Sequence, residues 1–176
     1  AVITFFATDN AGKESSASGT ASMPFTTVIV SGNVYNDVNG MTNSLVDGTG
    51  TNAGGINAIL VDGSGNVAAT AAVAADGTYA FSGVNGGSYT VVLTTATGTI
   101  GAAAPAVILP SGWVATGEGT TAAGDGTPNG TTNTFTVSTA NITGVNFGIE
   151  QPAVASNITA ASQVNPDGTV SVAVPA

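Results

Sequence analysis

Short stretches of this chain alternate between hydrophobic and polar residues, and glycine or Asn-Gly and Asp-Gly pairs interrupt them about every eight to twelve residues. A period of two residues is that of a β-strand with one buried face. Val, Ile, Thr, Tyr and Phe, which favour strands, recur in these stretches, whereas helix signals are poor throughout. The pattern therefore predicts an all-β fold, built as an antiparallel sandwich or barrel.

Seven segments carry the clearest strand pattern, and Asp-Gly turns at 62–63 and 76–77 lie between some of them. The alanine-rich segment 68–76 lies between two turn signals and is too short for a helix, so we assign it to a strand of small residues. The seven predicted strands are 26–35, 55–61, 66–74, 78–81, 88–95, 132–139 and 142–150.

The region 98–130 is rich in Gly, Ala and Pro, which predicts a long crossing loop with a short strand at GWVAT. Within it, the segment GEGTTAAGDGTPNG, residues 117–130, has almost no apolar content. We therefore expect 117–130 to be a loop exposed to solvent.

Aromatic residues recur at alternate positions in two of the predicted strands. Tyr79 and Phe81 share one face of their strand, and Tyr89, Val91 and Leu93 share one face of the next. Side chains of this kind in such a pattern are more often core than ligand platform. We predict that these five residues anchor the hydrophobic core.

The chain has 176 residues and a formal net charge of -9, with Lys13 as its only basic residue and no His or Cys. A chain of this charge has nothing with which to neutralise nucleic-acid phosphates or an anionic membrane surface. It has no run of about 18 apolar residues, and its first residues lack the basic region of an intact signal peptide. Low charge with abundant Thr, Asn, Gly and Ala favours an extracellular location.

The sequence lacks the side chains that the usual catalytic mechanisms need. Without His or Cys there is no ordinary base for a serine and no thiol nucleophile. A pair of carboxylates could still hydrolyse a glycosidic bond, with Asp62, Asp76, Glu118 and Asp125 as the candidates. Asp62 and Asp76 belong to turn dipeptides, and we do not expect an enzyme.

The order of the segments is more specific than any one of them. After VSGNVYNDVNG come GGINAILVDGSGNVAATAAVAADGTYAFSGVNGGSYTVVL, then PSGWVATGE and NFGI. Over 28–150 this order resembles the SdrD B-like domain, a prealbumin-like Cna B-type module of bacterial surface proteins. The residues themselves look most similar to the versions of this domain in Bacteroidetes. The resemblance implies a Greek-key β-sandwich that acts as a spacer or stalk in an adhesin. Related domains often carry a Lys isopeptide bond, but Lys13 lies outside the matching region.

The polar stretch NVYNDVNGMTNSLVDG, residues 33–48, is the candidate metal site. It is not an EF-hand, because Met41 and Gly48 stand where that loop needs oxygen side chains. Its oxygens would still suit a hard cation, and the D-x-N match to the resembling family implies structural Ca²⁺. The predicted ligands are Asp37, Asn39, the Met41 carbonyl, Asn43 and Asp47, and Asp76 could approach from a neighbouring hairpin. The alternative is an Asx-rich turn that satisfies its own backbone.

The two ends resemble pieces of bacterial Ig-like domains. VITFFA with its D-N-A-G turn resembles a closing hairpin, and SNITAASQVNPDGTVSVAVPA resembles an opening one. We therefore divide the chain into 1–27, a preceding domain's closing strands or a donor segment, 28–150, the sandwich, and 151–176, a linker and the opening strand of a following domain. Each end is expected to need strands from flanking sequence or from neighbouring copies.

These features favour a structural spacer of a large extracellular adhesin or surface fibre, braced by calcium. Its partners would be neighbouring domains of the same polypeptide or identical copies in a fibre, with no nucleic acid and no membrane insertion. Two alternatives stay open: a fibre protomer joined by strand exchange, and a module that binds surface glycans or proteins of a target. For the glycan-binding alternative, the candidate aromatic residues are Trp113 and Tyr35, although Trp113 suits packing at the sandwich edge.

Overall fold

The computed structural model describes residues 2–5, 19–22, 28–40, 42–152, 163–164 and 170–171. Every regular element in these residues is a β-strand. None of the described residues forms a helix able to cross a membrane. The strands are β1 (Val2–Phe5), β2 (Gly19–Ser22), β3 (Val28–Asn36), β4 (Thr49–Gly50), β5 (Asn57–Asp62), β6 (Val67–Ala72), β7 (Thr78–Val84), β8 (Gly87–Thr94), β9 (Val114–Gly119), β10 (Phe135–Val137), β11 (Asn146–Glu150), β12 (Gln163–Val164) and β13 (Val170–Ser171).

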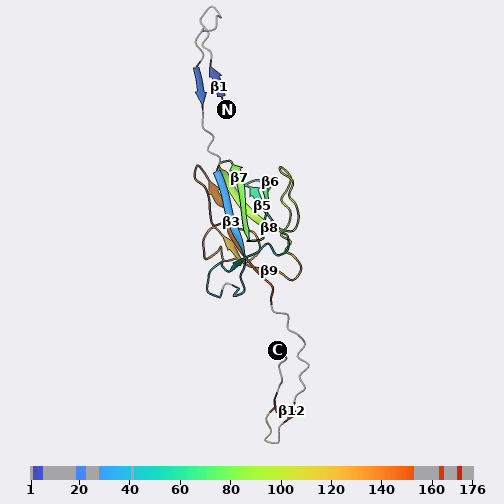
Figure 1. The fold of residues 1–176 in the computed structure, drawn as a ribbon. Helices are drawn as coiled ribbons and strands as arrows, with labels where there is room; N and C mark the ends of the chain where they lie inside the picture. Colours follow the sequence, from blue (N-terminus) through green and yellow to red (C-terminus); the bar gives the residue numbers. More distant parts are fainter. Residues whose placement is uncertain are drawn as a thin grey trace, which may run out of the picture.

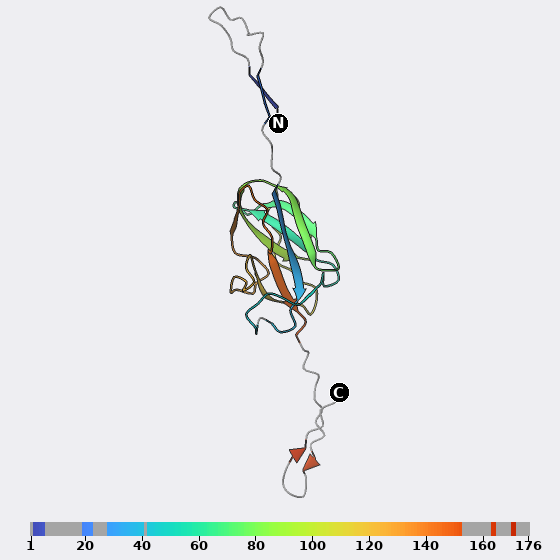
Figure 2. The ribbon, with the colours of Figure 1, turned by 60° about the vertical axis from the view of Figure 1, so that its left-hand side comes forward.

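Strands β3 to β11 form two sheets packed together as a β-sandwich (Figures 1 and 2). One sheet has the order β10-β8-β5-β6, and the other has the order β4-β3-β11-β9, with β7 also paired to β3. The predicted all-β sandwich is therefore confirmed. The named strand pairs are antiparallel with one exception, the parallel pair of β3 and β11.

The core lies between the sheets and contains the aromatic residues that alternation pointed to. Tyr79 is 5% exposed and Phe81 is 2% exposed, and their rings meet edge to face with centroids 5.6 Å apart. Tyr89, Val91 and Leu93 of β8 are buried as well. The predicted core anchors are confirmed, because alternation alone decides which face of a half-buried strand points inward.

A second hydrophobic cluster was not predicted. It consists of Ile59 and Val61 on β5, Val67 on β6 and Val92 on β8, and these side chains are separate from the main core. Ala104 and Val107 of the loop after β8 pack against the cluster. The Gly- and Ala-rich loop therefore covers one sheet of the sandwich, which makes β5 a strand buried on both faces.

The parallel pair β3–β11 fixes where the chain enters and leaves the sandwich. Phe147 lies opposite Val34 and Ile149 opposite Asn36. Because β3 is the first strand of the sandwich, β11 is the last, and both run the same way, the chain enters at one end and leaves at the other (Figure 1). The antiparallel sandwich thus contains one parallel strand pair, which the alternation pattern did not indicate.

The strands described near the two ends pair locally. β1 pairs with β2 from Val2 opposite Ser22 to Phe5 opposite Gly19, and β12 pairs with β13. Both pairs are two-stranded sheets apart from the two sheets of the sandwich. Whether either hairpin also pairs with another chain, and whether the domain boundaries fall at 27 and 150, stay predictions.

Candidate functional site

The predicted metal loop follows β3, and the part of it from Asn43 to Asp47 is held by its own hydrogen bonds. The Asn43 amide donates to Asp47 Oδ2 at 3.2 Å, and the Leu45 backbone N–H donates to Asn43 Oδ1 at 3.0 Å. Asn39 is exposed, and Met41 lies outside the described residues. The Asn43–Asp47 half of the loop thus has the Asx-turn bonding that we weighed as the alternative to a metal site.

Asp37 behaves differently from the rest of the loop, because it is fully buried. Its Oδ2 accepts a hydrogen bond from Thr116 Oγ1 at 2.8 Å, while its Oδ1 is buried with no hydrogen-bond partner. Gly148 of β11 makes the space for this carboxylate, since an added Cβ there would clash with Thr116 Oγ1 and lie 2.8 Å from Asp37 Oδ2. A buried polar atom without a partner costs about 1–3 kcal/mol.

Glu150 is the acid that sequence reasoning missed. It ends β11, and since the Asp37 backbone N–H donates to the Ile149 carbonyl at 2.9 Å, Asp37 and Glu150 come at the same end of adjacent strands. The Glu150 carboxylate oxygens lie 3.4 and 3.5 Å from where a Cβ on Gly40 would stand. Gly40, with a φ of 57°, therefore turns the loop closely over Glu150.

A cavity of about 270 Å³ adjoins this pair of acids. Two of its lining residues contact them: Thr116 bonds to Asp37, and Gly40 approaches Glu150. Gly126, Thr127 and Pro128 of the loop after β9 also line the cavity. The loops after β3 and after β9 are joined by a bond from the Val46 N–H to the Ala122 carbonyl, 2.7 Å.

The expected solvent exposure of 117–130 was wrong at its start. Residues 117–119 belong to β9, and Glu118 is fully buried. Glu118 Oε1 accepts from the Asn129 N–H at 2.6 Å, and Oε2 is buried without a partner. Burial raises the pKa of Glu118 to about 7, against the opposing effect of the backbone N–H groups of Asn129, Gly130 and Thr131, and nearby Asp125 raises it further.

The other acids considered for chemistry are held in turns. Asp62 Oδ1 accepts from the N–H groups of Ser64 and Asn66, and Asp76 Oδ1 accepts from the backbone and hydroxyl of Thr78. The Thr78 bonds hold the pKa of Asp76 below its usual value. Asp76 thus serves its own hairpin, as a D-G turn does without any metal.

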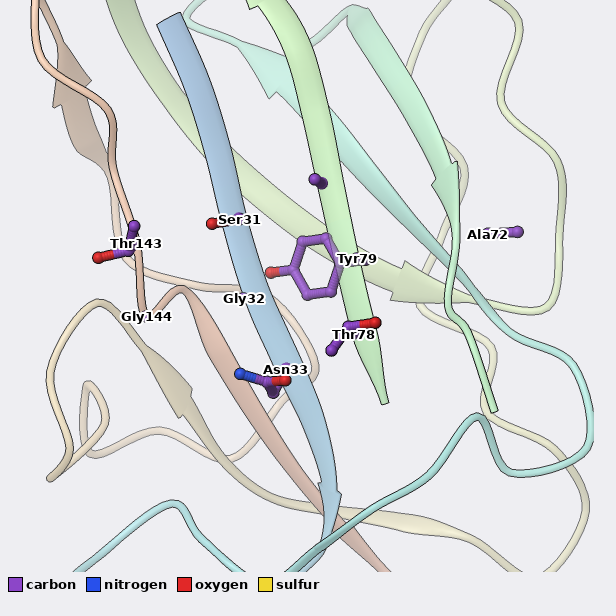
Figure 3. A pocket seen from close by; sticks show the side chains of 9 residues that line it. Ser31, Gly32, Asn33, Ala72, Thr78, Tyr79, Thr143 and Gly144 are labelled. Carbon is purple, nitrogen blue, oxygen red and sulfur yellow. The ribbon is translucent and has the colours of Figure 1, made fainter. Parts of the chain in front are cut away.

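An open groove of about 570 Å³ lies along β3 and β7 (Figure 3). In Figure 3 the Tyr79 hydroxyl points toward β3, and it donates to the Val145 carbonyl at 2.5 Å. The lining is small and uncharged: Ser31, Gly32, Asn33, Ala72, Thr78, Tyr79, Ala80, Thr143 and Gly144. Among residues 28–40 and 42–152 no aromatic side chain is exposed, and Trp113 packs against the core.

Asp37 and Glu150 lie at the same end of adjacent strands, and their carboxylates are the oxygen ligands that a hard cation would take there. The sequence has no imidazole or thiolate for a softer metal. In the part of the chain that the structure describes, no three or more Asp, Glu, His or Cys side chains gather into a metal cluster. Backbone carbonyls would have to complete the shell. No family model matches this chain, and no curated protein matches it.

Proposed function

We propose that the chain is a spacer module of an extracellular bacterial surface protein, and that calcium braces the end of the sandwich where Asp37 and Glu150 lie. The observation that carries the proposal is the parallel pairing of the first and last strands of the sandwich. Copies joined end to end would extend in line, and each would add at least the length of β3. Nine residues at about 3.3 Å each give about 30 Å.

The β3–β11 side of the sandwich is also bonded along most of its length, which suits a module that must resist extension. Before β11 begins, the Ser31 N–H donates to the Ile142 carbonyl at 2.9 Å and the Val145 N–H donates to the Ser31 carbonyl at 3.1 Å. Two side chains supplement the backbone bonds: Asn141 Oδ1 accepts from the Ile29 N–H, and Asn146 Oδ1 accepts from the Asn33 N–H. Tension between the ends would load all of these bonds together.

Calcium supports the same function by bridging two adjacent strands. Asp37 and Asn39 carry the D-x-N match to the SdrD B-like family, but in our proposal the second carboxylate is Glu150 rather than Asp47. A cation there would give the buried Asp37 Oδ1 a partner and tie the start of the loop to the end of β11. Ion binding to the folded state alone stabilises it by about 2.7 kcal/mol at 100 times the dissociation constant.

The spacer is tested by length. Chains with one, two and three copies joined head to tail are compared by small-angle X-ray scattering. We expect the maximum dimension to grow by a constant increment of at least about 30 Å per copy. A maximum dimension that stays nearly constant would mean that the copies fold back on one another, and the spacer would be rejected.

The brace is tested separately by thermal unfolding in calcium and in excess chelator. We expect calcium to raise Tm of the unaltered chain and to lose this effect in Asp37→Asn and in Glu150→Gln. Asp76→Asn is the matched control, because Asp76 is an exposed carboxylate bound within its own turn. Equal Tm values in calcium and chelator would reject the brace and leave the spacer standing.

A further inference from the structure

Glu118 ties the loop after β9 to the sandwich by two bonds. Its side-chain Oε1 accepts from the Asn129 N–H at 2.6 Å, and its backbone carbonyl accepts from the Asp125 N–H at 2.7 Å. The loop thus leaves β9 and returns twice to the same residue. Gly119 allows this return, since an added Cβ would lie 2.9 Å from the carbonyl carbon of Gly124.

No countercharge meets this buried carboxyl in the described part of the chain, which contains no Lys, Arg or His. The charged group near it is Asp125, on the loop itself, and it repels an ionised Glu118. From the other elements, Phe147 lies opposite Glu118 on β11, and Val46 packs against the loop at Gly124. Both are apolar, and Glu118 Oε2 has no partner. The backbone N–H groups of Asn129, Gly130 and Thr131 favour an ionised Glu118, but the burial of the carboxyl outweighs them while the loop is closed.

We propose that Glu118 is a pH-sensitive latch: in its protonated form it holds residues 120–130 against β9, and loss of the proton releases them. Release lets water reach Oε2, which the closed loop denies it. Burial raises the pKa of Glu118 to about 7, so the latch would open within the physiological range of pH. This inference goes beyond the spacer and needs no cation.

Opening would also change the end of the sandwich described above. Gly126, Thr127 and Pro128, which the latch would release, form one wall of the cavity beside Thr116 and Gly40. A neutral-to-alkaline medium would therefore expose a surface that a mildly acidic one keeps covered.

The test follows Glu118 and its loop together by NMR, in chelator so that no cation at Asp37 contributes. The ¹³C shift of the Glu118 carboxyl gives its pKa, and hydrogen-exchange protection of the Asn129 amide, corrected for intrinsic rates, gives loop opening. We take the pKa of Glu118 as about 7 when the loop is closed and as the ordinary 4.5 when it is open. The equilibrium constant for loop opening should then rise by about two orders of magnitude between pH 4.5 and pH 8.

Two variants separate the latch from a general pH effect. Glu118→Gln keeps an acceptor for the Asn129 N–H but cannot ionise, so the protection should no longer change with pH. Asp125→Asn keeps a side-chain oxygen that can accept the hydrogen bond from the Thr127 N–H. Because it removes a charge that repels ionised Glu118, it should lower the pH midpoint of both measurements. The latch is overturned if Glu118 titrates near 4.5, if Asn129 protection stays constant through the carboxyl titration, or if the step persists in Glu118→Gln.

Discussion

Replacing Gly148 by Ala tests how tightly the end of the sandwich is packed around Asp37. The added methyl would clash with Thr116 Oγ1 and lie 2.8 Å from Asp37 Oδ2. Gly148 does not have a positive φ, so alanine is not opposed by the backbone, and Gly→Ala at a compatible site stabilises by about 0.4–1 kcal/mol. Any loss of stability therefore reports on the contact.

The expected loss has two parts. Overpacking a well-filled site costs about 1–3 kcal/mol. If the methyl displaces the Thr116 hydroxyl, Asp37 keeps no side-chain hydrogen bond, and a buried acceptor left unsatisfied costs about 1–3 kcal/mol more. The free energy of unfolding should fall by about 2–6 kcal/mol, a large part of the stability of an ordinary domain.

Urea unfolding followed by circular dichroism measures this loss. Gly63→Ala is the matched control, since Gly63 has no positive φ and a Cβ there would meet nothing nearer than the Ser88 carbonyl at 3.8 Å. We expect the control to unfold at the same urea concentration as the unaltered chain or slightly above it. If Gly148→Ala also keeps its midpoint, the site is not closely packed and the geometry argued for Asp37 is wrong.

Two further predictions concern buried polar groups. The folded-state pKa of Glu118 is raised from 4.5 to about 7. The protonated carboxyl therefore contributes fully to the free energy of unfolding below pH 4.5, and this contribution is lost as pH rises to 7. The difference of about 2.5 units corresponds to about 3 kcal/mol, and urea midpoints across this range should fall in the unaltered chain but not in Glu118→Gln. Tyr79→Phe leaves the buried Val145 carbonyl without the hydroxyl and should lower stability by about 1–3 kcal/mol, whereas Tyr35→Phe, at a half-buried ring, should change it little. An unchanged midpoint in Tyr79→Phe would mean that water replaces the hydroxyl.

Alternation along the chain was sufficient to predict most strands, because the inward face of a strand depends on its own sequence. Strands β3, β5, β6, β7 and β8 all overlap their predicted segments. The alanine-rich strand β6 is a case in point, since helix propensity alone would have favoured a helix there. The cluster of Ile59, Val61 and Val92 had a signal too, because the nearly continuous apolar run INAILV is typical of a strand buried on both faces.

The partner of Asp37 could not be found in this way. The D-x-N motif directs attention to acids that follow within the same loop, whereas Glu150 lies 113 positions further along the chain. Only the parallel pairing of β3 with β11 brings the two together, and nothing in either strand's own pattern indicates that it pairs in parallel. A long-range register therefore decides which carboxylates come to the same end of adjacent strands.

Glu118 was misplaced for a different reason, which also explains why the two buried acids matter. A segment with few apolar side chains was expected in solvent, but its glycines pack by backbone, as at Gly119 and Gly124, and so cover β9 without any large hydrophobic residue. Among the described residues, Asp37 and Glu118 are the fully buried acids, and each has one oxygen without a partner. The described part of the chain contains no Lys, Arg or His with which to neutralise them. A cation beside Glu150 can compensate Asp37, while Glu118, whose Oε1 meets a backbone N–H, can lose its charge by taking up a proton. In our proposals, the same shortage of basic residues would make one end of the sandwich responsive to calcium and to pH, through separate carboxylates that can be mutated one at a time.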